Sequence, residues 1–140
     1  MDEATKSLLN VLFLFGFAAV FVGVWIRFLH TSSLNSGWTQ LANQYHCKQP
    51  FKGTTARFQS AVLNGVSFTG LLVLGANNHG LFMEPIPPFR LFHKPLLIPW
   101  TELQIEPLSS FPFKRYLVLF KSQPDITMEV RRSTLDRLGP

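Results

Sequence analysis

Two places in the chain carry residue types that could do acid–base or metal chemistry. His46 and Cys47 are adjacent, but neighbouring side chains on a regular element point apart, and the 140 residues contain one Cys. His93 lies in a Pro-rich segment and could act as an acid or base with Glu84 or Glu102. We expect no metal at His46 and Cys47. We expect His93 to be a loop histidine held by backbone contacts.

The glycine patterns of common catalytic loops do not occur in this sequence. It has no G-x-x-x-x-G-K-[ST] or G-x-G-x-x-G phosphate loop and no G-x-S-x-G nucleophile elbow. The net charge of +5 would suit an anionic partner, but no motif for nucleic-acid readout accompanies it. The sequence therefore predicts a non-enzymatic protein with no catalytic residue, no metal, no cofactor and no nucleic-acid partner.

The most suggestive constellation is basic and aromatic. It combines two phenylalanines with four cations: Phe111, Phe113, Lys114, Arg115, Arg131 and Arg132. We expect the first four on a turn and the two arginines at the end of a strand that pairs with it. Each cation near an anionic leaflet contributes about 1 kcal/mol, and phenyl rings insert among headgroups. The cluster is thus a candidate contact for lipid or a partner. Alternatively, the rings fill the end of the domain and the cations are solvated.

The element that would bring this cluster to a membrane is an apolar segment near the N-terminus. Residues 7–26 (SLLNVLFLFGFAAVFVGVWI) carry no charge and would span about 30 Å as a helix, the thickness of the hydrocarbon core. Their thirteen Leu, Val, Phe and Ile side chains favour insertion by about 5 kcal/mol. We predict a tail over 1–6, a transmembrane helix over 7–29 with Trp25 and Arg27 as its interfacial anchor, and a polar linker over 30–36.

Two other kinds of apolar segment fit this sequence less well. A buried core helix would show a polar stripe, and none occurs over these five turns. A cleavable signal peptide has an apolar run of about 7–15 residues followed by a small-x-small site, whereas RFLH follows this run. We therefore expect an uncleaved, single-pass anchor.

The sequence gives weaker signals for whether this helix associates with another helix and for the side of the membrane on which the C-terminal domain lies. Gly16, Ala19 and Gly23 share one face, where small residues let two helices approach closely. This face is a candidate contact for a homodimer or another membrane protein, although Gly and Ala are also common in such helices. The charges flanking the span are nearly balanced, but the free Cys47 and the absence of an Asn-x-Ser/Thr sequon are compatible with a cytosolic domain. We expect the C-terminal domain at the cytoplasmic face of the inner (plasma) membrane.

Residues 37–140 read as a small, mostly antiparallel β domain. The spacing of Trp38, Leu41, Ala42 and Tyr45 predicts a short helix that docks on its own domain or on the membrane. Beyond it, alternating patterns and turn residues, with an Asn64-Gly65 hairpin, predict about seven strands and a final short helix over 133–138. The fold class is one transmembrane helix plus a β barrel or sandwich with short flanking helices.

Two stretches of the domain resemble a known family. Residues 80–83 (GLFM) and 97–103 (LIPWTEL) are similar to the G-x-L-y-L and I-P-x-x-(D/E)-I rhythm of GRAM and bacterial pleckstrin-homology-like (PH-like) domains. The 38–45 pattern with residues 95–100 also resembles small bacterial proteins that have one N-terminal anchor. The resemblance implies binding of lipid or protein and carries over no catalytic residue.

Three hypotheses follow from the sequence. The first is a membrane-anchored binding module that contacts membrane lipid or a partner protein at the cytoplasmic face. The second is a structural subunit of a membrane complex, associating through its transmembrane helix. The third is an enzyme that uses His93 with Glu84 or Glu102.

Overall fold

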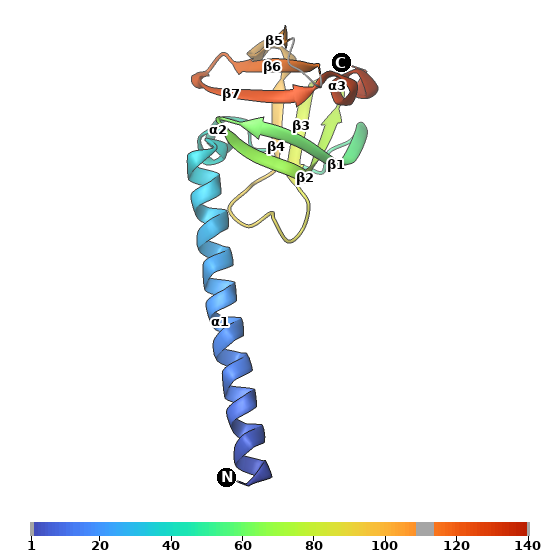
Figure 1. Cartoon of the computed structure of the whole chain (residues 1–140). Helices are drawn as coiled ribbons and strands as arrows, with labels where there is room; N and C mark the ends of the chain where they lie inside the picture. The colour runs from blue at the N-terminus through green and yellow to red at the C-terminus, as the bar shows by residue number, and fades with distance from the viewer. Residues whose placement is uncertain (1, 109–113, 140) are drawn as a thin grey trace.

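The N-terminal quarter of the protein is one long helix. The computed structural model describes residues 2–108 and 114–139. Helix α1 (Glu3–Asn35) begins at Asp2, whose carboxylate accepts the Thr5 N–H at 2.8 Å, and it runs away from the rest of the molecule (Figure 1). Every residue from 8 to 24 is exposed, and the helix is long and apolar enough to cross a membrane.

The last two turns of α1 correct one prediction. Residues 30–36, expected as a polar linker, continue the helix to Asn35 and pack on the β domain, with Leu29 and Ser33 buried. The Ser33 hydroxyl donates to the Phe92 carbonyl at 2.7 Å and lies 2.7 Å from the Thr39 hydroxyl. The linker prediction is wrong because these tertiary contacts outweigh the weak helix preference of Ser and Thr. Helix and domain are therefore joined without a flexible connector.

Helix α2 (Trp38–Tyr45) turns back onto the domain and confirms the expected short helix. Gly37, at φ +78°, makes the turn, and a Cβ there would lie 2.6 Å from Ile126 Cδ1. All four apolar residues of its predicted face are buried in the domain core. The stripe docks on its own domain and not on the membrane.

Within residues 2–108 and 114–139, seven antiparallel strands form one curled sheet. The strands are β1 (Thr54–Leu63), β2 (Val66–Ala76), β3 (Gly80–Pro85), β4 (Leu96–Pro99), β5 (Leu103–Leu108), β6 (Arg115–Phe120) and β7 (Gln123–Arg131). Their order is β4-β3-β2-β1-β7-β6-β5. Because β1 and β7 pair over only three residues each, the sheet bends there into a near-barrel (Figure 1). A 3-10 turn (Trp100–Glu102) joins the two edge strands, and α3 (Arg132–Leu138) follows β7.

The turns largely follow the predicted chemistry. Asn64 and Gly65, at φ 50° and 81°, connect β1 and β2 as the left-handed pair expected of this dipeptide. Gly139 ends α3 in the left-handed region. Pro85 is the last residue of β3, where it pairs with Leu72.

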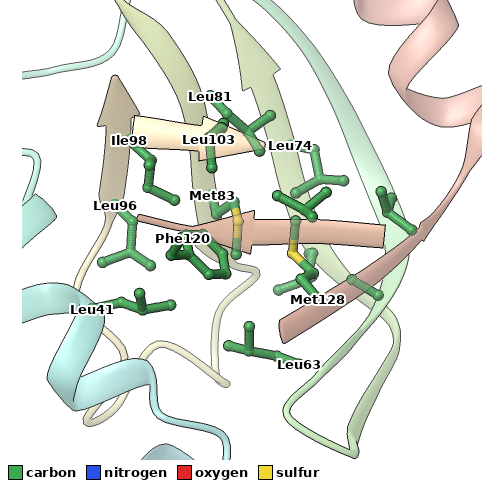
Figure 2. Close-up of a cluster of buried hydrophobic side chains, with 14 of the residues drawn as sticks. Leu41, Leu63, Leu74, Leu81, Met83, Leu96, Ile98, Leu103, Phe120 and Met128 are labelled. Atoms are coloured by element: carbon green, nitrogen blue, oxygen red, sulfur yellow. The ribbon is translucent and has the colours of Figure 1, made fainter. Parts of the chain in front are cut away.

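The core lies between the two halves of the sheet and under α2. Figure 2 shows side chains from both halves converging, with Met83 of β3, Phe120 of β6 and Met128 of β7 close to one another and Leu41 of α2 beside them. The alternation predicted in β7 is confirmed, since Ile126, Met128 and Val130 are all buried. The fold class expected from the sequence, an apolar N-terminal helix plus a small β domain, is confirmed.

Candidate functional site at the junction of helix and domain

The connection between β3 and β4, residues 86–95, extends from the domain and folds back beside α1; we call it the junction loop (Figure 1). Two ring contacts place it on the helix. The Phe89 ring centroid is 4.9 Å from that of Trp25, and the Phe92 ring meets His30 edge to face at 4.9 Å. The loop therefore runs along α1 over about a turn and a half of helix.

Backbone groups of the junction loop are held by side chains from both helices. Trp38 Nε1 donates to the Lys94 carbonyl at 2.8 Å, and the Ser33 hydroxyl holds the Phe92 carbonyl. Inside the loop, Phe89 N–H donates to the Ile86 carbonyl at 2.8 Å. These bonds satisfy polar backbone groups of the loop and tie it to both helices.

His93 anchors the loop in the core. Its ring is buried against the rings of Trp38 and Phe68, and Nδ1 lies 2.8 Å from the Leu91 carbonyl, whereas Nε2 has no hydrogen-bond partner among the described residues. Burial lowers the pKa of His93. The imidazole is therefore neutral, with its proton on Nδ1, and it is a loop histidine held by a backbone contact, as predicted.

The carboxylates considered as partners of His93 have other partners. Glu84 pairs with Arg90 at 2.8 Å, and Glu102 accepts from the Ser122 hydroxyl at 3.0 Å. The acid–base hypothesis requires a carboxylate beside the His93 imidazole. The contacts of Glu84 and Glu102 are with Arg90 and Ser122 instead.

The outer surface of the junction loop is apolar. Leu91 and Phe92 are 46% and 43% exposed, and Phe28 on the adjoining part of α1 is 59% exposed. Phe58 of β1 borders a hollow that Pro87 also lines; the residue is 68% exposed and its φ is +57°. A bulky residue in the left-handed region is unusual, and here it turns a phenyl ring outward beside the loop. Exposed aromatic and aliphatic groups thus gather on the side of the domain that faces α1.

A second hollow, of about 230 Å³, opens between α1, α2 and the loop. It is lined by His30, Leu34, Thr39, Ala42, Asn43, Phe92 and Lys94. The Lys94 ammonium and the His30 imidazole give its rim cationic or hydrogen-bonding character beside the Phe92 ring. These groups have the chemistry to receive an anionic group that carries an apolar chain.

The predicted basic–aromatic cluster lies elsewhere. Phe111 and Phe113 lie outside the described residues. Lys114 precedes β6 and Arg115 is its first residue. Arg131 ends β7 and Arg132 begins α3. In Figure 1 these strands are at the opposite end of the molecule from the N-terminus of α1.

Two of these arginines make structural contacts. Arg132 donates to the carbonyls of Arg115 and Leu108 at 3.1 and 2.9 Å, and its guanidinium lies 5.5 Å from the centre of the Tyr116 ring. Arg115 pairs with Glu129 at 3.2 Å. Lys114 and Arg131 are exposed. Contact of the cluster with lipid or a partner stays a prediction.

The candidate residues on α1 lie mostly at its exposed surface, and their role in helix association or at an interface stays a prediction. Gly16, Ala19 and Gly23 are exposed, and a Cβ at either glycine would have no described atom of another element within 4 Å. Arg27 is exposed, whereas Trp25 is half-buried by the junction loop.

His46 and Cys47 belong to the connection after α2. His46 forms an isolated bridge with Leu96, and Cys47 Sγ lies 3.1 Å from the Gln49 carbonyl. Within residues 2–108 and 114–139, no three His, Cys, Asp or Glu side chains gather as metal ligands would.

Sequence reasoning missed the junction loop. Its signal was present, since two prolines precede a segment that mixes Phe89, Leu91 and Phe92 with basic residues. The sequence does not indicate that this loop packs against α1, because the contacts with Trp25 and His30 join residues about 60 positions apart. Comparison with family models, curated proteins and solved structures finds no match for this chain.

Proposed function

We propose that this chain is a single-pass, membrane-anchored, non-enzymatic binding module. Its β domain is held at the cytoplasmic face of the inner membrane, where it contacts membrane lipid or a partner protein. One observation carries the proposal: every residue of α1 from 8 to 24 is exposed and all but Asn10 are apolar, yet its C-terminal turns are part of the folded domain. Such an apolar surface is unfavourable in water and suits a bilayer.

The packing of α1 also supports an anchor that is retained. Leu29 and Ser33 are buried against the domain, and the Ser33 hydroxyl holds the junction loop. Cleavage after the apolar run would leave a short stub or remove these contacts. A signal peptide has no such role in the fold of the mature protein.

The β domain is proposed to be of GRAM or PH-like type. Seven antiparallel strands curled into a near-barrel and followed by the helix α3 support this assignment. The binding function rests on this architecture together with the exposed apolar and basic groups beside α1.

Extraction and topology measurements test the proposal. We expect the full chain to remain in the membrane pellet after alkaline carbonate and to keep its first thirty residues, as read by intact mass. A reporter fused at the C-terminus should be active on the cytoplasmic side. Release by carbonate or loss of the N-terminal segment would overturn the anchor, and a periplasmic reporter would reverse the assigned side.

A second function is favoured by the open small-residue face of α1. As a subunit of a membrane complex, the chain would contact other helices through Gly16, Ala19 and Gly23, all three of which are exposed. A Cβ at either glycine would have no described atom of another element within 4 Å. Crosslinking in native membranes should then yield a partner or a homodimer that Gly16→Leu with Gly23→Leu removes. Ala18→Leu, which adds a leucine on another face of the same helix, is the matched control.

A further inference from the structure

We infer that the junction loop enters the headgroup layer of the leaflet from which α1 emerges, so that the chain contacts the bilayer at two places. The inference rests on the proposed function, since it takes α1 to cross the membrane. Lipid of this leaflet then covers the exposed apolar side of the loop.

The contact with Trp25 sets the depth of the loop. The uncharged segment of α1 ends at residue 26, and a Trp at such an end lies at the boundary between hydrocarbon and headgroups. Phe89, whose ring is 4.9 Å from Trp25, must then lie at the same level. Phe92 contacts His30, which is five residues farther along α1 and therefore about 7.5 Å nearer to the aqueous side. The loop thus covers the depth of the headgroup layer.

The backbone of the loop suits this environment. Pro87 and Pro88 have no N–H group, so two donors that would need a partner are missing. The Ile86 N–H donates to the Leu71 carbonyl, and the His93 N–H donates to the Arg90 carbonyl at 2.9 Å. Internal satisfaction of this kind is what an irregular segment needs at the edge of a bilayer.

The side chains of the loop match an interface with lipid. Leu91 and Phe92 present apolar groups outward, and the charge of Arg90 is paired with Glu84 at 2.8 Å. Arg27 and Lys94 are exposed near the same level and complement anionic headgroups. Continuity of this surface with the exposed side of α1 argues for the leaflet itself and against a separate protein partner.

Fluorescent probes in the full chain test the inference. In a Cys47→Ser background, single cysteines at Leu91, Phe13 and Gln104 carry an NBD label, and the protein is reconstituted in liposomes of phosphatidylethanolamine and phosphatidylglycerol. Leu91 and Gln104 are both exposed, so the labels disturb little packing. Phe13 reports on the bilayer interior, and Gln104 on β5 reports on the opposite end of the domain.

We expect the probe at Leu91 to emit at shorter wavelength than the probe at Gln104. It should lose more fluorescence to lipid carrying a nitroxide near the headgroup than to lipid carrying one deep in the chain. Water-like emission at Leu91 with strong deep quenching at Phe13 would overturn the inference alone. A blue-shifted Leu91 probe that lipid nitroxides do not quench would also overturn it, because protein would then cover the loop. Absence of quenching at Phe13 would instead overturn the proposed anchor.

Discussion

Both ends of the β domain carry aromatic and basic residues among the part that the structure describes, such as Phe92 and Lys94 at one end and Tyr116 and Arg132 at the other, but these residues have different roles. At the end facing α1, Leu91 and Phe92 are exposed while the loop's backbone groups are bonded to Ser33 and Trp38. At the other end, the Arg132 guanidinium donates hydrogen bonds to two backbone carbonyls.

The difference shows that composition alone does not separate a contact surface from a structural element. A guanidinium that is hydrogen-bonded to backbone carbonyls holds neighbouring segments of the domain together, and it has fewer donors left for a ligand. An apolar side chain left outside a backbone that is already satisfied is available for contact. The exposed apolar groups at the end facing α1 are therefore freer to contact another surface than the arginine donors at the other end.

The largest effect is expected at Trp38, which joins α2, the core and the junction loop. Trp38→Ala removes a fully buried ring and the donor to the Lys94 carbonyl, so the free energy of unfolding should fall by about 3–5 kcal/mol. Denaturant titration of the full chain in mild detergent, followed by circular dichroism, measures the change. Trp25→Ala, a half-buried control on α1, should cost clearly less; equal costs would contradict the central role of Trp38.

Arg132 provides the next largest effect, at the opposite end. Arg132→Ala leaves the carbonyls of Arg115 and Leu108 without this donor, and the loss should be about 2 kcal/mol of unfolding free energy. The same denaturant titration applies. Lys121→Ala, an exposed control, should change stability by about 0.5 kcal/mol or less. An Arg132→Ala variant as stable as the control would show that the cation is not structural.

The junction should also weaken in acid because His93 is buried and neutral. Its pKa is lowered on folding from the ordinary value of 6.5, so the unfolded chain takes up the proton more readily. The contribution of His93 is therefore complete above that value and is lost as the pH falls below it, by up to about 1.4 kcal/mol per pH unit. Unfolding titrations at about pH 7.5 and about pH 5.5 measure this slope. His93→Phe should flatten it, and an unchanged slope in that variant would assign the pH dependence to other groups.

The smallest effect is expected for the pair of Arg115 and Glu129. Their side chains are 34% and 40% exposed, so water screens the interaction, and a double-mutant cycle with Arg115→Ala and Glu129→Ala should give about 0.5 kcal/mol or less. The coupling should shrink further in high salt. A coupling as large as the effect of Arg132→Ala would mean that this end is held by ion pairs and not by carbonyl contacts.

Local sequence patterns predicted helices, strands and turns well where the residues involved favour a single backbone conformation or a single buried face. Asn64-Gly65 predicted a hairpin because both residues accept positive φ, and the spacing of Trp38, Leu41 and Tyr45 predicted the buried face of α2. The same kind of reasoning failed over residues 30–36. Their polar side chains are typical of a linker in isolation, but Ser33 finds partners in Thr39 and in the junction loop.

The candidate site was predicted only in part. Trp25 was expected at an interface from its place at the end of the apolar run, whereas its ring contact with Phe89 was not foreseen. The junction loop was recognised only as a Pro-rich segment around His93. No periodicity in a loop indicates which surface it will fold against, because that depends on elements far away in the sequence.

An apolar N-terminal helix and a domain of short antiparallel strands follow from local patterns in the chain, since periodicity and turn chemistry act between near neighbours. How that helix meets the domain, and which loop lies beside it, depends on the folded arrangement. These features depend on pairs such as Ser33 with Phe92 and Trp38 with Lys94. Such contacts form only after the chain has brought distant segments together, so no local pattern encodes them.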